Sequence, residues 1–209
     1  MRGLQRRAAR ARFDQWAATY EDSFIWRYYF MPLHGMLESR ITPVNGLSIL
    51  DLGSGTGDML RRFERAGASR LVGLDESEGM LKVARKLSRD CSRIEYIHSS
   101  VDSNLAVEEE FDIVISCIAF HHFPDSSGLL EEIHRILKPG GRLYICDLTD
   151  KGILGRSMLA YGRVKRADKH YYNLRSLTRM ANEAGFEILL AESIRRFPPT
   201  MLMCAAKKN

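Results

Sequence analysis

Residues 47–58 read L-S-I-L-D-L-G-S-G-T-G-D, a short apolar run that ends in an acid and is followed by three glycines at alternate positions. This pattern predicts a buried strand that turns into a helix through a glycine loop. Gly53, Gly55 and Gly57 let the backbone adopt positive φ and let a ligand lie directly on the main chain, which a Cβ would prevent. The stretch therefore predicts a nucleotide-like ligand in an α/β domain.

Two common nucleotide-binding loops do not fit this stretch. The dinucleotide fingerprint requires G-x-G-x-x-G, and after Gly53 and Gly55 the position of the last glycine holds Asp58. No Lys-Ser/Thr pair follows the loop, which excludes a phosphate-cradling P-loop. The loop instead suits a nucleoside that carries no phosphate chain.

The size and composition of the chain fit one α/β domain with a full core, since 45% of its 209 residues are hydrophobic. No apolar run approaches the ~20 residues of a membrane-spanning helix, and the first residues do not form a signal-peptide pattern. We therefore expect a soluble, cytoplasmic protein. The four cysteines are scattered, and no Cys/His or carboxylate set has the spacing of a metal site, so we expect no metal.

The net charge of +5 is unevenly distributed along the chain. Five arginines fall within the first twelve residues with no acid among them, and a second basic stretch runs from Lys151 to Lys169. Both stretches are typical of solvated helix faces, and both also fit contact with an anionic membrane or an anionic substrate. A transit peptide is a further interpretation of the N-terminal arginines.

Strand-like and helix-like patterns alternate from residue 47 onward. The expected strands are Ser48–Leu52, Arg70–Asp75, Ile94–Ser99, Phe111–Cys117, Gly141–Asp147, Glu187–Glu192 and Met201–Ala206. The expected helices are 57–67, 78–89, 126–138 and 174–184, with a K-P-G-G turn at 138–141. This alternation predicts an α/β fold with a parallel sheet and right-handed crossovers.

Four motifs occur in a familiar order: L-D-L-G-S-G-T-G at 50–57, L-V-G-L-D-E-S at 71–77, F-D-I-V-I-S at 111–116 and L-K-P-G-G-R-L at 137–143. Together they resemble the class I S-adenosylmethionine (SAM) dependent methyltransferases, in particular the small type 11 group, which includes quinone and natural-product methyltransferases. The resemblance covers about residues 44–207.

This resemblance implies a Rossmann-like sheet of seven mostly parallel strands, with helices on both faces and the last strand antiparallel. It implies SAM as the cofactor, bound by a domain of residues 47–209 that follows a helical lid of residues 1–46. Residues 150–173 fall where the family inserts an element on the substrate side.

An aromatic segment precedes the first strand. Residues 3–20 have helical composition, and eight aromatic residues lie between Phe13 and Phe30. A stripe of this kind is typical of core packing. In the resembling family a W-A-x-x-Y-like segment instead lies over the cofactor pocket, and Trp16 and Tyr20 match that pattern. Tyr20 is therefore the candidate lid contact.

The cofactor residues are expected at the strand ends, because an open parallel sheet binds its ligand there. By resemblance, Asp51 organises the glycine loop and the methionine amino group; a buried structural acid is the alternative. Asp75 fits a carboxylate that accepts hydrogen bonds from both ribose hydroxyls, with a helix cap as the alternative. Either Ser100 or Asp102 takes the place of the family's adenine-binding acid. The full expected set is Tyr20, Asp51, Gly53, Ser54, Gly55, Gly57, Asp75, Glu76, Met80, Ser100, Val101, Asp102 and Cys117.

Two adjacent histidines follow the fourth strand. The segment I-A-F-H-H-F-P-D would place His121 and His122 beside the reactive methyl group. A histidine with a pKa near neutrality can remove a proton from a hydroxyl or an enolisable carbon. We expect His121 to be this base because it comes first after the strand; the alternative is that both histidines only line or cap the next helix. Asp147 is expected as a wall of the acceptor pocket or as a plain loop carboxylate.

The function expected from these features is methylation of a small-molecule acceptor by direct displacement from SAM. The N/D-P-P-Y/F stretch of nucleic-base methylases is absent, so we expect no nucleic-acid partner. A membrane-associated lipid or quinone methyltransferase is one alternative, with the basic N-terminus in contact with an anionic membrane. A non-catalytic SAM-binding accessory protein is another, and a protein or RNA methylase is a fourth interpretation.

Overall fold

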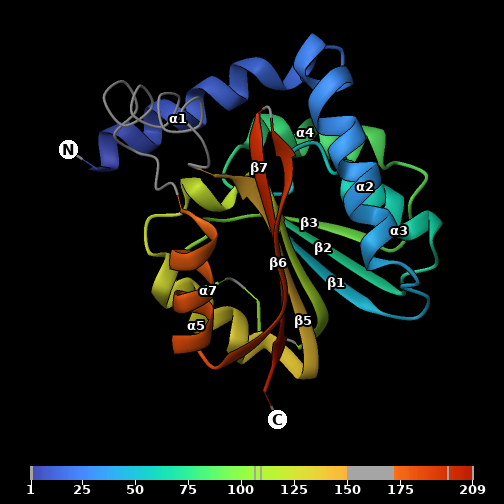
Figure 1. Cartoon of the computed structure of the whole chain (residues 1–209). Coiled ribbons are helices and arrows are strands. Elements are labelled where there is room, and N and C mark those ends of the chain that lie inside the picture. Colours follow the sequence, from blue (N-terminus) through green and yellow to red (C-terminus); the bar gives the residue numbers. More distant parts are fainter. Residues whose placement is uncertain (1, 106, 109, 150–171, 197, 209) are drawn as a thin grey trace.

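A seven-stranded sheet forms the centre of the protein in the computed structural model, which describes residues 2–105, 107–108, 110–149, 172–196 and 198–208. The strands are β1 (Ser48–Leu52), β2 (Arg70–Asp75), β3 (Ile94–His98), β4 (Phe111–Cys117), β5 (Leu137–Leu148), β6 (Phe186–Arg196) and β7 (Pro199–Lys207). Their order is β3-β2-β1-β4-β5-β7-β6 (Figure 1). β7 runs antiparallel to β5 and β6, and the other pairs are parallel. The predicted Rossmann-like class and its antiparallel last strand are confirmed.

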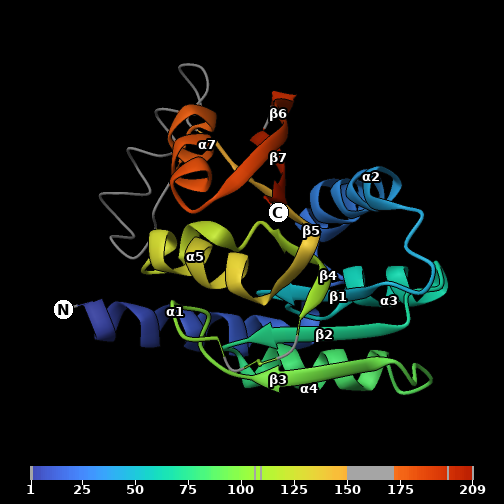
Figure 2. The ribbon, with the colours of Figure 1, turned by 90° about the horizontal axis from the view of Figure 1, so that it is seen from below.

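Helices cover both faces of the sheet, as predicted. They are α1 (Arg2–Trp16), α2 (Met31–Ile41), α3 (Asp58–Arg65), α4 (Glu78–Leu87), α5 (Ser126–Ile136) and α7 (Leu174–Glu183), with short turns η1 (Ala17–Thr19), η2 (Trp26–Phe30) and η3 (Phe120–His122). α5 and α7 pack on one face, where Leu130 and Leu177 are fully buried. α2 and α3 pack on the other, where Leu37 and Phe63 are fully buried. Figures 1 and 2 show these two helical layers on either side of the strands.

The strand that precedes the glycine loop is the most enclosed part of the sheet. All five residues of β1 are buried, because β2 and β4 flank it and helices cover both of its faces. A parallel strand buried on both sides reads as a continuous apolar run, which is what made β1 recognisable in the sequence. Its one acid, Asp51, lies at the end where the loop begins.

The predicted helix 126–138 is too long at its C-terminus. α5 ends at Ile136, and Leu137 is already extended and pairs with Phe111 of β4. Lys138 stands before Pro139, whose ring disfavours helical backbone at the preceding residue. The K-P-G-G stretch therefore forms an irregular start to β5, and the register of the β4–β5 pair shifts there.

α1 is anchored to the start of α4 by one carboxylate. Asp14 Oδ1 accepts hydrogen bonds from Ser77 Oγ at 2.6 Å and from the Gly79 amide at 2.9 Å. A Cβ on Gly79 would lie 2.8 Å from Asp14 Cα, so glycine permits this close approach. In Figure 1, α1 lies above the strand ends along the upper edge of the molecule.

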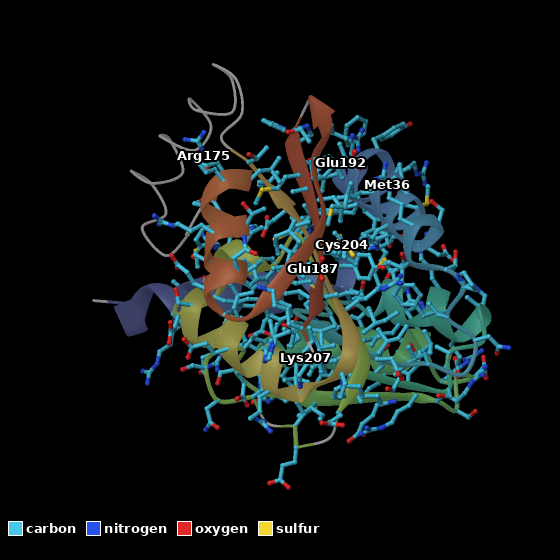
Figure 3. The ribbon with its side chains drawn as sticks, turned by 60° about the horizontal axis from the view of Figure 1, so that its bottom comes forward. Met36, Arg175, Glu187, Glu192, Cys204 and Lys207 are labelled. Carbon is cyan, nitrogen blue, oxygen red and sulfur yellow. The ribbon has the colours of Figure 1, made fainter. Side chains whose placement is uncertain are left out.

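β6 and β7 form a hairpin at one edge of the sheet, both longer than predicted because pairing continues up to the turn at Arg196↔Pro199. Figure 3 shows Glu192 of this hairpin near Met36 of α2, and an ion pair of Glu192 with Arg40 joins β6 to that helix. Among the described residues, no helix has both the length and the apolar character needed to cross a membrane. The expected insertion, apart from 172–173, and the basic stretch Lys151–Lys169 lie outside the described residues.

Replacing Gly57 by alanine should destabilise the fold more than the same change at Gly46. Both glycines have a left-handed backbone conformation, with φ of 78° and 77°, so alanine costs a similar backbone free energy at either position. Only at Gly57 would the new Cβ clash, 2.0 Å from the Tyr96 hydroxyl oxygen, whereas nothing lies within 4 Å at Gly46. We expect Gly57→Ala to lower the free energy of unfolding by about 1–3 kcal/mol more than Gly46→Ala in urea titrations. Equal losses of stability in the two variants would show that the Tyr96 side chain moves aside at no cost in free energy.

Candidate active site

A cavity of about 360 Å³ opens where β1, β2 and β4 end. Most of the residues expected at a cofactor line it, although they come from separate parts of the chain. The expected residues in its wall are Tyr20, Gly53, Ser54, Gly55, Asp75, Glu76, Met80, Val101, Cys117 and His122. The sheet topology thus brings together the glycine loop, the β2 acid and one of the two histidines.

The glycine loop is fixed to the end of β2 by backbone hydrogen bonds. The amides of Gly53 and Ser54 donate to the Leu74 carbonyl at 2.8 and 3.0 Å, and the Gly55 amide donates to Asp75 Oδ2 at 2.8 Å. Gly55 has a φ of 53° and lines the cavity, and a Cβ there would meet no protein atom within 4 Å. Its bare backbone therefore faces open space, which is the cradle that a bulky ligand requires.

Asp75 presents a carboxylate that is already oriented. Oδ2 accepts from Gly55 N and Oδ1 accepts from Ser77 N, both at 2.8 Å. The alternative role of capping α4 belongs to Ser77, whose Oγ accepts from Met80 N at 3.1 Å. Burial raises the pKa of Asp75 to about 6, while the two amides oppose that rise. Its remaining lone pairs can accept hydroxyl donors from a ligand, and the apolar side chains of Met80 and Val101 lie in the same wall.

A concentration of acids surrounds the loop. Asp51 is 3% exposed, and burial together with the neighbouring Asp75 and Asp58 carboxylates raises its pKa to about 8. Asp51 lies outside the cavity wall, behind the loop. Carboxylates that raise one another's pKa in this way favour a positively charged ligand, because a nearby cation stabilises their ionised forms. A sulfonium or ammonium group fits this requirement.

An ion pair in the wall, between His34 and Asp58, was not predicted from the sequence. His34 Nδ1 lies 2.9 Å from Asp58 Oδ2, and Arg62 Nε donates to the same oxygen at 2.7 Å. Burial alone would lower the pKa of His34, but the neighbouring Cys117 and Asp58 raise it to about 9. The pKa of Asp58 is lowered in spite of its burial, by His34 first and then by Arg62. His34 precedes β1 by more than a dozen residues, so no local spacing links it to the loop.

Aromatic side chains form another part of the cavity wall. They come from α1, from the segment between α1 and α2, and from the loop after η3: Phe13, Tyr20, Trp26, Phe30 and Phe123. Tyr20 packs against Trp26 and Phe30 with ring centroids 5.3 and 5.6 Å apart. The N-terminal aromatic residues therefore serve both as packing and as cavity wall, and their role as a lid stays a prediction.

His122, not His121, faces the cavity. His121 is 2% exposed and outside the wall; its Nδ1 lies 2.7 Å from Asp147 Oδ1, and its amide donates to Asp147 Oδ2 at 2.9 Å. His122 lies in the wall, with its ring centroid 4.2 Å from that of His121 and 5.5 Å from that of Phe13. Asp147 is 1% exposed and holds His121. The order of the two histidines after the strand did not predict which of them lines the cavity, since the geometry of the short turn η3 decides this.

The backbone between β4 and η3 is strained. Ile118 has a φ of 54°, a left-handed conformation that is unusual for a β-branched residue, and it lines the cavity. Its amide donates to the Cys146 carbonyl at 2.7 Å, which holds the conformation. Such strain occurs most often at functional sites.

Three other expected cofactor residues lie outside the cavity wall. Gly57 packs against Tyr96, as described above, and supports the loop from behind. Ser100 Oγ donates to Asp102 Oδ2 at 2.8 Å, and neither residue lines the cavity. Val101 between them does, so the chain after β3 contributes an apolar contact here and not the expected polar one. Wall residues that sequence reasoning did not single out include Ala9, Arg10, Thr56, Ala119 and Pro124.

Comparison with known sequences identifies the family. Residues 50–145 match a family described as a methyltransferase domain. The chain is 35% identical over 109 residues to a demethylmenaquinone methyltransferase of Clavibacter sepedonicus, covering 52% of this chain and 44% of that protein. It is 30% identical over 162 residues to the ubiquinone/menaquinone biosynthesis C-methyltransferase UbiE of Escherichia coli O1:K1, covering 73% of this chain and 61% of that protein. The matched region thus spans less than two thirds of either relative.

Solved structures agree on the fold. The methyltransferase bound to the Trm112 activator of Haloferax volcanii superimposes with a TM-score of 0.81 at 23% identity, covering 94% of this chain and 98% of that one. Magnesium protoporphyrin IX methyltransferase of Synechocystis, solved with S-adenosylhomocysteine (SAH), gives 0.75 at 18% identity, covering 95% of both chains. Residues 50–145 thus carry a methyltransferase domain of the type 11 group, on the fold of the class I SAM-dependent methyltransferases, as the four motifs predicted.

Binding of SAH should depend on the ionisation of Asp75. Ribose hydroxyls donate to a carboxylate, so the contribution of Asp75 to affinity should be complete well above its pKa of about 6 and should be lost as pH drops through that pKa. Asp75→Ala should weaken binding by about 1.5–3 kcal/mol, the range for hydrogen bonds to a charged group. Calorimetry between pH 5 and 8 measures both effects. Asp75→Asn is the matched control, because the dependence of its affinity on pH near pH 6 should disappear. An unchanged affinity for SAH in both variants would show that Asp75 does not bind the ligand.

The His34 imidazole should titrate near pH 9, which NMR of the histidine ring protons can measure. Its folded pKa of about 9 exceeds the ordinary value of 6.5, so its contribution to stability is complete below pH ~6.5 and is lost as pH rises through 9. Asp58→Asn removes the carboxylate, and burial should then bring the pKa to or below 6.5. A pKa near 6.5 in the unmodified protein would contradict the ion pair.

Proposed function

We propose that the protein transfers a methyl group from SAM to a small, flat, apolar acceptor. The observation that carries this proposal is the composition of one cavity: its wall contains the glycine loop and Asp75 together with five aromatic side chains and His122. The loop and the carboxylate suit a nucleoside with a positive charge, and the aromatic side chains suit an aromatic ring. Donor and acceptor would therefore meet inside a single enclosed space.

The residues around the loop fit SAM, which supplies a methyl group on a sulfonium centre. Asp75 would accept the ribose hydroxyls, and Met80 and Val101 would contact the adenine ring. Asp51 and the other carboxylates would stabilise the positive charges of the methionine end. Phe13, Tyr20 and Trp26 would exclude water and hold the acceptor in line with the methyl group, which is most of what a direct displacement requires.

His122 is the candidate general base in this arrangement. It lines the cavity beside Phe13, whereas His121 lies behind it on Asp147. By accepting the proton of a ring hydroxyl, His122 would raise the electron density of the acceptor as the methyl group is transferred. His121 and Asp147 would act on the reaction only through the position that they give to His122.

A hydroquinone-type ring is the acceptor class that we favour. The aromatic wall suits such a ring, and two relatives carry the names of a demethylmenaquinone methyltransferase and a ubiquinone/menaquinone C-methyltransferase. The contrasting candidate is an accessory protein that binds SAM without turnover.

Turnover with methyl-labelled SAM separates these candidates. The full chain is incubated with a panel of hydroquinones and naphthohydroquinones, with simple phenols and amines for comparison. We expect label in the hydroquinone products, on carbon. Binding of SAH by calorimetry without label in any acceptor would overturn the enzymatic proposal and support the accessory protein; label only in amines would overturn the acceptor class.

Replacing His122 by alanine should lower turnover by about 10²- to 10⁴-fold, the usual contribution of a general base. The affinity for SAH should change little, because the glycine loop and Asp75 remain. The pH–rate profile provides a second readout, since the limb that reports the base should vanish in His122→Ala. His121→Asn is the control for a positioning residue and should retain that limb. Near-normal turnover of His122→Ala would mean that proximity alone drives the reaction.

A further inference from the structure

An exposed apolar surface lies on the segment between α1 and α2. Its four members are Phe24, Ile25, Tyr28 and Met31, which are 77%, 42%, 59% and 43% exposed. The rings of Phe24 and Tyr28 are in contact, with their centroids 4.4 Å apart and their planes tilted by 37°. Large apolar side chains in water are normal when scattered singly, but four within eight residues form a patch that marks an interaction site.

The same segment has a second aromatic face, which points inward. Trp26 and Phe30 alternate with the exposed residues, are 6% and 8% exposed, and line the cavity. The π-helical turn Trp26–Phe30 produces this division, since it places residues four or five apart on the same side. A single turn of chain therefore lies between the cavity and the exposed patch.

Exposed arginines occur in this segment and on the helix that precedes it. Arg27 lies within the patch, and Arg7, Arg10 and Arg12 are exposed on α1. Of the acids nearby, Asp14 is bound to α4 and Glu21 pairs with Arg61 at 2.7 Å, which leaves Asp22 exposed. Figure 1 shows α1 and the turns that follow it along the same upper edge of the molecule. Aromatic rings next to arginines on one edge are the combination that an anionic lipid surface attracts.

We propose that residues 24–31 dock on an anionic lipid bilayer, with the four apolar side chains in the headgroup region and Arg7, Arg10, Arg12 and Arg27 on lipid phosphates. A second exposed apolar pair, Leu189 and Leu190, belongs to β6 and is not part of this surface. The inference stands on the outer face of the segment and does not depend on the acceptor proposed above.

Co-sedimentation of the full chain with phosphatidylcholine vesicles, with and without phosphatidylglycerol, tests this surface. We expect binding to the anionic vesicles that weakens as salt is raised. Phe24→Ser with Tyr28→Ser should reduce vesicle affinity by about tenfold or more, because two aromatic rings no longer leave water. Arg7→Gln with Arg27→Gln should reduce it by about fivefold for each arginine removed.

Leu189→Ser with Leu190→Ser is the control, since it removes two exposed apolar side chains elsewhere and should leave vesicle binding unchanged. Calorimetry with SAH shows whether the Phe24/Tyr28 variant keeps its fold, and its affinity should match that of the unmodified chain. The proposal is overturned if the unmodified chain stays in the supernatant with anionic vesicles, or if the folded Phe24/Tyr28 variant binds them equally well. In either case the patch would belong to a protein partner.

Discussion

The hydrogen bond from the Gly55 amide to the Asp75 carboxylate joins the glycine loop to the acid on which the site depends, beside the two backbone bonds from Gly53 and Ser54 to Leu74. It fixes the loop after β1 against the end of β2, and it uses one lone pair of the carboxylate while leaving others for a ligand. A second amide, that of Ser77, holds the other carboxylate oxygen. Backbone donors cannot rotate away as side chains do, so the carboxylate is oriented before any ligand arrives.

The electrostatic character of the cavity follows from where its charges are compensated. Asp58 is matched by His34 and Arg62, whereas Asp51 has its pKa raised by burial and by its acidic neighbours. The wall thus contains one neutralised acid, Asp58, and outside the wall lies a buried acid, Asp51, whose ionised form needs a positive charge nearby. A cationic ligand would supply that charge, which is a physical reason for the family's sulfonium cofactor to bind here.

The sequence predicted the parts of the site that depend on local chain geometry. The glycine loop and Asp75 could be located because a strand, a turn and a helix follow one another within a few residues. The sequence could not show whether His121 or His122 lines the cavity, because the geometry of a short turn decides this. His34 and Asp14 were beyond reach for another reason: each contacts a residue more than twenty positions away, and only the packing of α1 and α2 on the domain brings them there.

The contact of Asp14 with Ser77 has a consequence for communication across the molecule. Ser77 donates its hydroxyl to Asp14 of α1 and its amide to Asp75, so one residue joins the outer helix to the carboxylate in the cavity wall. A ligand that binds Asp75 and an external surface that binds α1 therefore act on the same short chain of hydrogen bonds. By thermodynamic linkage, the factor by which a ligand in the cavity changes the affinity of α1 for an external surface equals the factor by which that surface changes the affinity for the ligand. Occupancy of the cavity and attachment of α1 would then be coupled parts of one equilibrium.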